Sequence, residues 1–296
     1  MEVVSVVLLA GGIAGVMAWL LVGRWPGLDP ATPRVATRAV VEEVRRHQTL
    51  RTFVHRRTDP ATATGLALTA AVALAAAGSI GVGALLLMVQ TDRGFARWDK
   101  SFGEWGADHA TAASTTFLRE VSLLGGTTIT VALAVVVAVV EVIRTRQRAI
   151  PGFLLCVIGG VTILLNVTKF VVSRDRPTIR QLTGFSGSSF PSGHAATAAA
   201  SLAALALLLG LRRSHRAKAA LTGLAVGLAV AVASTRVLLG VHWFTDVLAG
   251  LALGWAWFAI CSIAFGGRLL RFGAPVDAAE RAEALELEGA SRSRSG

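Results

Sequence analysis

The chain has 296 residues, of which 53% are hydrophobic and only 16% are charged, and its formal net charge is +11. This composition excludes an intrinsically disordered chain, a collagen and a long soluble coiled coil. In a soluble protein the positive charge would indicate nucleic-acid binding, whereas in a membrane protein it first indicates cytoplasmic loops. The distribution of the apolar residues decides between the two, and it predicts no nucleic-acid partner.

Seven stretches without charged residues follow one another along the chain. Each reaches the length of about 17–25 residues that a membrane-spanning helix needs. Backbone groups in lipid must bond within their own segment, which favours helices. We predict an all-α, polytopic membrane helical bundle with spans at 3–23, 61–91, 121–140, 149–168, 195–211, 219–235 and 247–267.

The first span and the segment after it precede the main bundle. Glu2 stands where a signal peptide would be basic, and Arg24 follows without a small-residue cleavage site, so we predict that 1–23 is a retained transmembrane helix. The basic segment 24–60 is either an amphipathic helix on anionic lipid or a solvated linker. We predict that residues 61–267 form a core of six helices and that 268–296 form a disordered cytoplasmic tail.

Loop charges predict the orientation of the bundle. Segment 24–60 holds eight arginines against four carboxylates, and further basic residues follow at 144–148, 212–218 and 268–271. By the positive-inside rule these loops, and with them the C-terminus, are cytoplasmic. The loop 92–120 is then external. Its aromatic residues form an interfacial belt or a lip that guides a lipid; they are Phe95, Trp98, Phe102 and Trp105.

Three polar clusters lie at predicted helix ends on that external face. They are Lys169 with Arg174, Asp175, Arg176 and Pro177; Pro191, Ser192, Gly193 and His194; and Arg236, His242 and Asp246. External loops are usually poor in basic residues. The presence there of Lys169, Arg174, Arg176, Arg180 and Arg236 predicts an anionic ligand.

The residue types indicate what that ligand is. The turn at Ser192 and Gly193 opens a helix, whose N-terminal N–H groups bind phosphate. His242 and Asp246 are four residues apart and share a helical face, so the carboxylate can hold one ring nitrogen protonated and leave the other as a nucleophile. His194 can donate a proton to a leaving oxygen.

The arrangement Lys169, six residues, Arg176–Pro177; then Pro191–Ser192–Gly193–His194; then Arg236, five residues, His242, three residues, Asp246 resembles the three-part signature of the type 2 phosphatidic acid phosphatase superfamily. The helix layout extends the resemblance over 61–267, with the first helix as an addition. Thr235 stands where the family usually has serine, which keeps the hydroxyl.

The resemblance implies a mechanism and a substrate class. His242, oriented by Asp246, would attack phosphorus to give a phosphohistidine, and His194 would protonate the leaving group and then activate water. The phosphate oxygens would be held by Lys169, Arg176, Ser192, Gly193 and Arg236. No metal or other cofactor is implied, because cationic side chains neutralise the phosphate, and a bell-shaped pH profile is expected.

We therefore expect a bacterial plasma-membrane phosphatase that acts at the outer leaflet on a lipid phosphate or a polyprenyl diphosphate. Alternatives are an undecaprenyl-type diphosphate phosphatase specifically, a phosphotransferase that uses the same phosphoenzyme, and a non-catalytic phosphate or lipid carrier. The oligomeric state is left open.

Overall fold

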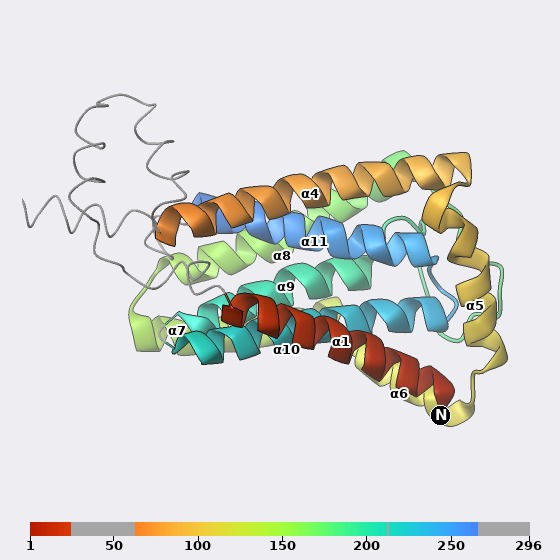
Figure 1. The fold of residues 1–296 in the computed structure, drawn as a ribbon, viewed down its shortest axis with the longest axis horizontal. Coiled ribbons are helices and arrows are strands. Elements are labelled where there is room, and N and C mark those ends of the chain that lie inside the picture. The colour runs from red at the N-terminus through yellow and green to blue at the C-terminus, as the bar shows by residue number, and fades with distance from the viewer. Residues whose placement is uncertain (25–62, 212, 266–296) are drawn as a thin grey trace, which may run out of the picture.

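A computed structural model describes residues 1–24, 63–211 and 213–265 of the chain, and the residues in these ranges form helices and connecting turns without a strand. Figure 1 shows the elements along the chain. They are α1 (Glu2–Arg24), α4 (Ala63–Thr91), the 3-10 helix η2 (Gly94–Trp98), α5 (Asp99–Asp108), α6 (Ala112–Leu123), α7 (Thr127–Thr145), α8 (Ala149–Val172), α9 (Gly193–Gly210), α10 (His215–Leu238) and α11 (Phe244–Phe265).

The all-α membrane bundle predicted from the sequence is confirmed. Seven helices in the described ranges are long and apolar enough to cross a membrane: α1, α4, α7, α8, α9, α10 and α11. One boundary differs, because the stretch 121–140 is broken after Leu123 and the spanning helix starts only at Thr127. The break contains Gly125, where an added Cβ would lie 2.6 Å from the carbonyl oxygen of His194, so this turn approaches α9 closely.

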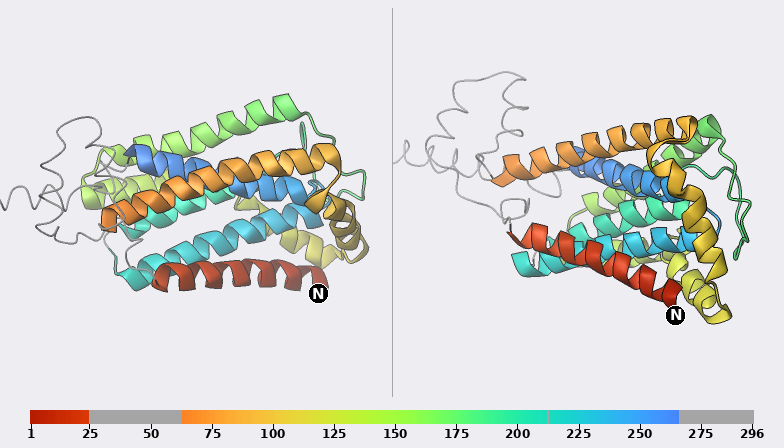
Figure 2. Two further views of the ribbon diagram at one scale, coloured as in Figure 1. Left: turned by 45° about the horizontal axis from the view of Figure 1, so that its top comes forward. Right: turned by 45° about the vertical axis from the view of Figure 1, so that its right-hand side comes forward.

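Helix α9 occupies the centre of the bundle and is its most buried span. It contacts α7, α8, α10 and α11, while α4 covers α11 and α1 covers α10 (Figures 1 and 2). Small residues allow these contacts. A Cβ on Gly250 of α11 would lie 2.6 Å from the Ser192 carbonyl at the start of α9, and one on Gly11 of α1 would lie 2.8 Å from the Gly227 carbonyl of α10. Glycine at these positions therefore lets the helix backbones approach one another closely.

The two ends of the bundle differ in composition. At one end, helix α5 lies across the ends of the spans (Figure 1, right). The turns at the opposite end join α7 to α8 and α9 to α10. These turns and the helix ends beside them hold basic residues: Arg144, Arg146, Arg148, Arg213 and Arg216. The basic segments used to predict the orientation, 144–148 and 212–218, therefore lie at the same end of the bundle, opposite α5.

Two segments predicted from the sequence lie outside the described residues. These are most of the basic segment 24–60, with its amphipathic helix or solvated linker, and the tail 268–296. The division of the chain into four segments stays a prediction.

Candidate functional site

The three polar clusters come together at the end of the bundle that α5 covers. Lys169 lies in the last turn of α8, Gly193 begins α9, Arg236 lies in the last turn of α10, and Asp246 lies in the first turn of α11. Each of these four helices therefore contributes a residue of the three clusters from the terminus that reaches this end. The apolar middle of each span packs in the bundle or faces outward.

The turn between α10 and α11 explains the spacing between Arg236 and His242. The N–H of Val241 donates to the Arg236 carbonyl at 3.2 Å, and the N–H of Gly240 donates to the Val237 carbonyl at 2.9 Å. This is a Schellman C-cap, in which Gly240 adopts the left-handed conformation with φ 69°. The N–H of His242 also donates to the Arg236 carbonyl. The five residues between Arg236 and His242 thus end α10 and bring the backbone of His242 back to the last turn of α10.

Asp246 is held by the start of α11. Its Oδ2 accepts the N–H of Trp243 at 2.9 Å, the contact of a helix-capping carboxylate three residues into the helix. The same oxygen accepts the hydroxyl of Ser189 and lies 3.5 Å from Nδ1 of His242. The Asp246 side chain is fully buried. These contacts fix the carboxylate on the Nδ1 edge of the His242 ring.

The other edge of the His242 ring faces the cations. Its Nε2 lies 3.4 Å from Nη1 of Arg176. Burial, which exceeds the opposing effect of Asp246, lowers the pKa of His242 to about 4, so the imidazole is neutral at pH 7. With Nδ1 directed at a carboxylate, the proton belongs on Nδ1 and the lone pair on Nε2. The ring has the orientation and charge of a nucleophile.

Lys169 and Arg176 converge on the segment that joins α8 to α9. Both donate to the carbonyl of Ser188, Lys169 at 3.1 Å and Arg176 at 3.3 Å. Arg176 also donates to the carbonyls of Gly187 at 2.9 Å and Val241 at 2.7 Å. The two cations are therefore neighbours, and Arg176 joins this segment to the turn that carries His242.

Arg236 and Ser192 contribute buried donors without partners. Arg236 donates from Nη1 to Ser122 at 2.7 Å. Among the described residues, however, its Nε and the hydroxyl of Ser192 are buried and have no hydrogen-bond partner. Unpaired buried polar groups are costly and usually mark a missing ligand or water. An oxyanion would satisfy both.

The start of α9 contributes the remaining residues predicted to bind or protonate a phosphate, and one of the expected contacts differs. The N–H of Ser192 donates to the Asp246 carbonyl at 2.9 Å, so this amide is not available to a phosphate. Ser192 can offer a phosphate only its hydroxyl, whereas its amide was expected to take part. A Cβ on Gly193 would meet nothing within 4 Å, so the backbone there borders open space. His194 follows in the first turn, where its ring interacts electrostatically with Arg236, His242, Lys169 and Arg176.

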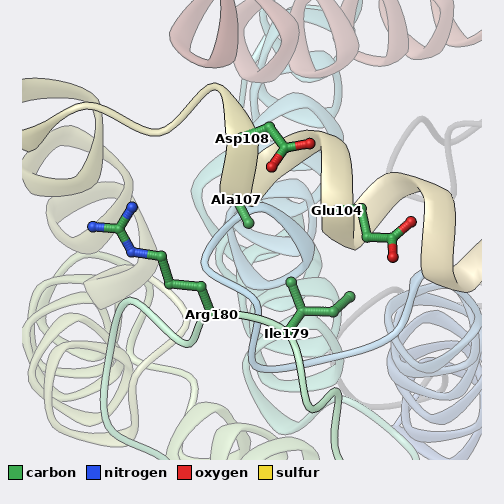
Figure 3. A pocket seen from close by; sticks show the side chains of 5 residues that line it. All are labelled: Glu104, Ala107, Asp108, Ile179 and Arg180. Carbon is green, nitrogen blue, oxygen red and sulfur yellow. The ribbon is translucent and has the colours of Figure 1, made fainter.

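Two of the five cations predicted to lie on the external face, Arg174 and Arg180, are not directed at the predicted phosphate site. Arg174 is an ion-pair partner of Asp246 at 2.5 Å and of Asp99 at 2.7 Å. Arg180 is exposed and, as Figure 3 shows, lies beside a separate cavity of about 560 Å³, which Glu104 and Asp108 of α5 also line. Arg174 is thus neutralised by two carboxylates and Arg180 lines another cavity, and the prediction that Lys169, Arg176 and Arg236 hold the phosphate is unchanged.

Sequence reasoning missed four residues that bond to the predicted site residues or to Arg174: Asp99, Ser122, Ser189 and Thr245. Ser122 and Asp99 come from the segment between the first two spans of the core, far from the motifs along the chain. Their residue types are common in polar loops and carry no signal of their own.

No metal-binding group is found in the described parts of the chain, since no three His, Cys, Asp or Glu side chains gather there in a suitable arrangement. Metal-independent chemistry stays a prediction, which a chelator tests.

Comparison with known proteins gives a family match. The model of the PAP2 superfamily matches residues 150–269, a range that includes every predicted site residue from Lys169 to Asp246.

Two kinds of curated relative are similar to part of the chain. Phosphatidylglycerophosphatase B of Bacillus subtilis is 37% identical over 124 residues, which is 41% of this chain and 61% of the relative. Lipid A 1-phosphatase of Rhizobium etli is 38% identical over 108 residues, which is 33% of this chain and 42% of the relative. The matched segment thus spans less than two thirds of either protein.

One solved structure shares the fold. It is the crystal structure of a transmembrane PAP2-type phosphatidylglycerolphosphate phosphatase from Bacillus subtilis, with a TM-score of 0.56 and 26% sequence identity. The superposition covers 65% of this chain and 94% of that protein.

Proposed function

Residues 150–269 place this chain in the PAP2 superfamily, and from that membership we propose that it hydrolyses a phosphate ester of a membrane lipid through a phosphohistidine on His242. The observation that carries the proposal is the His242 ring itself, with Asp246 3.5 Å from Nδ1 and Arg176 3.4 Å from Nε2. A carrier that only binds phosphate would need the cations but no oriented, neutral imidazole.

The first chemical step uses the lone pair on Nε2 of His242. A P–N bond forms, the P–O bond to the lipid breaks, and its electron pair goes to the lipid oxygen, which takes a proton from His194. Lys169, Arg176, Arg236, the Ser192 hydroxyl and the N–H groups at the start of α9 hold the other phosphate oxygens. Positive charge that develops on His242 is balanced by Asp246.

The second step releases phosphate. His194, now neutral, takes a proton from water as the water oxygen attacks phosphorus, and the P–N bond breaks to return His242 to its neutral form. Phosphoryl transfer needs mainly positioning and charge stabilisation. Three basic side chains supply that stabilisation, so the step requires no metal.

Support for a lipid substrate comes from the position of the site at the end of a bundle of spanning helices. The neighbouring helices η2 and α5 carry three aromatic side chains that are 41–51% exposed: Phe95, Trp98 and Phe102. Their rings form a cluster with the ring of Phe244. Aromatic side chains favour the membrane–water interface. A headgroup can reach the cations there while its acyl chains stay in lipid.

The test is phosphate release by the purified full chain in mixed micelles with excess chelator. The panel contains phosphatidylglycerol phosphate, phosphatidic acid, a lipid A 1-phosphate, undecaprenyl diphosphate and a water-soluble phosphate monoester. We expect release from at least one lipid and equal rates with and without chelator. Activity restricted to the soluble ester would contradict the lipid substrate, and activity lost in chelator and restored by Mg²⁺ would contradict the cation-only mechanism.

We also propose that the site faces outward, since the basic turns lie at the opposite end of the bundle. Single cysteines at the exposed positions Ser101 and Arg148 test this in whole cells with a membrane-impermeant maleimide. Ser101→Cys should be labelled in intact cells and Arg148→Cys only after lysis. The reverse pattern would place the site in the cytoplasm.

A further inference from the structure

A carboxylate outside the three motifs is built into the support of the site. Asp99, the first residue of α5, is 4% exposed. Its Oδ1 accepts the N–H of Thr245 at 2.8 Å, and its Oδ2 accepts the Thr245 hydroxyl at 2.7 Å and Nη2 of Arg174 at 2.7 Å. All three donors are adjacent to Asp246 in sequence or bonded to it.

Arg174 connects the two carboxylates. Its Nη1 donates to Oδ1 of Asp246 at 2.5 Å and to the Thr245 hydroxyl at 2.8 Å, while its Nη2 is taken by Asp99. The guanidinium plane is fixed further by the Trp243 ring, 5.5 Å from its carbon. Arg174, which is partly buried between the two carboxylates, is fixed in position because each carboxylate oxygen takes a separate N–H.

Helix α5 is in turn fixed to the start of α11. The rings of Phe102 and Phe244 lie 4.7 Å apart, and Phe95 meets Phe244 edge-on at 6.5 Å. Asp99 therefore sits on an element that lies across the end of the bundle and is attached to the helix that carries Asp246.

We propose that Asp99 is a positioning residue for phosphoryl transfer: acting through Arg174 and the backbone of Thr245, it holds Asp246 in the place and charge state that His242 needs. The proposal rests on the phosphohistidine function proposed above. Asp99 touches neither His242 nor the phosphate site, so its effect must pass through Arg174 and Thr245.

Asp99→Asn is the first variant. The new amide would direct N–H groups at the hydroxyl of Thr245 or at Nη2 of Arg174, and Arg174 would keep a single carboxylate. The Asp246 charge is then more fully cancelled and stabilises a positively charged His242 less well. We expect kcat to fall about 10-fold, as for supporting residues elsewhere, with KM unchanged.

Two further variants distinguish a positioning role of Asp99 from a packing role: Arg174→Gln, and the double variant that combines it with Asp99→Asn. Asp99→Asn keeps an oxygen that can accept the N–H of Thr245, so its effect should pass through Arg174. The double variant should then lose no more activity than Arg174→Gln alone, whereas independent effects would multiply. Arg174→Gln also removes a positive charge near His242. Protonation of His242 or Asp246 then becomes easier, and we expect the acidic limb of kcat/KM to move to higher pH by roughly 0.5 unit or more.

The remaining charges around His242 are unchanged in these variants. They are Asp246 on α11, Arg176 after α8, Arg236 on α10, Lys169 on α8 and the ring of His194 on α9. A shift of the acidic limb is therefore attributable to the Asp99–Arg174 pair.

Asp108→Asn is the matched control, since it makes the same change on the same helix at an exposed position. It should keep wild-type kcat and KM. Thermal unfolding and gel filtration of each variant in detergent report whether the fold is retained.

The outcomes distinguish this proposal from the proposed function. Wild-type protein without phosphate release, or His242→Ala with wild-type release, would refute the function. An active wild type with an unchanged kcat in Asp99→Asn, a raised KM in place of a lowered kcat, or multiplying losses in the double variant would refute the role of Asp99 alone.

Discussion

Replacing His242 by alanine lowers kcat for lipid phosphate release by at least ~10³-fold, because the variant has no atom that can form the P–N bond. The ring is 3% exposed, so its removal leaves a buried space between Asp246 and Arg176 with no second imidazole in it to replace the nucleophile. The measurement is steady-state phosphate release in mixed micelles, compared with the exposed histidine variant His109→Ala, which should match the wild type.

A covalent intermediate gives the same experiment a second readout. Wild-type protein quenched during turnover of ³²P-labelled substrate should carry label that survives base and is lost in acid, the behaviour of a phosphoramidate, and His242→Ala should carry none. Retention of more than a tenth of the activity by His242→Ala would contradict the assignment. Label that survives acid would instead indicate a phosphoester on another residue.

Replacing Asp246 by asparagine lowers kcat by about 10³–10⁴-fold while keeping the size of the side chain, a loss similar to that found when the orienting carboxylate of a catalytic triad is changed to an amide. The amide can present an N–H to Nδ1 of His242. That contact favours the tautomer with its proton on Nε2, and the nucleophilic lone pair is lost. The uncharged amide also no longer balances positive charge on His242 in the transition state.

The kinetic pattern identifies the cause of the loss in Asp246→Asn. KM should change little, since the cations proposed to bind phosphate, Lys169, Arg176 and Arg236, are intact. Asp108→Asn on α5 is the control, and thermal unfolding in detergent checks that the cap on Trp243 is retained. A loss confined to KM would mean that Asp246 shapes the phosphate pocket and does not orient the nucleophile.

The wild-type pH profile follows from the same ring. Because burial holds the pKa of His242 at about 4, the nucleophile stays neutral from pH 8 down to pH 5. The acidic limb of kcat/KM, which reports the free enzyme, should therefore lie near pH 4 in the wild type and supplies the reference for Arg174→Gln.

The structure also explains why some spacings in the motifs could be recognised from sequence. Arg236 and His242 are separated by a helix C-cap that closes on Gly240, and His242 and Asp246 are separated by the start of the next helix. Such local geometry depends on neighbours in the chain, so it leaves a regular spacing. The break before α7 was not predicted. It lies at Gly125, which approaches the backbone of His194, and a contact between residues so far apart in the chain leaves no local pattern.

The sequence by itself determined the helical class, the number of spanning helices and the motif residues that gather at the site, because apolar run length and helix-end spacing are properties of contiguous segments. Only the tertiary structure decided which cations face a ligand and which are neutralised: Arg174 and Arg176 are two residues apart, yet one pairs with Asp99 and Asp246 and the other reaches Nε2 of His242. Along the chain Asp99 resembles the exposed Asp92 and Asp108 of the same loop. Its role arises from packing of α5 across the bundle end, which brings residues 99, 174 and 246 into hydrogen-bond contact.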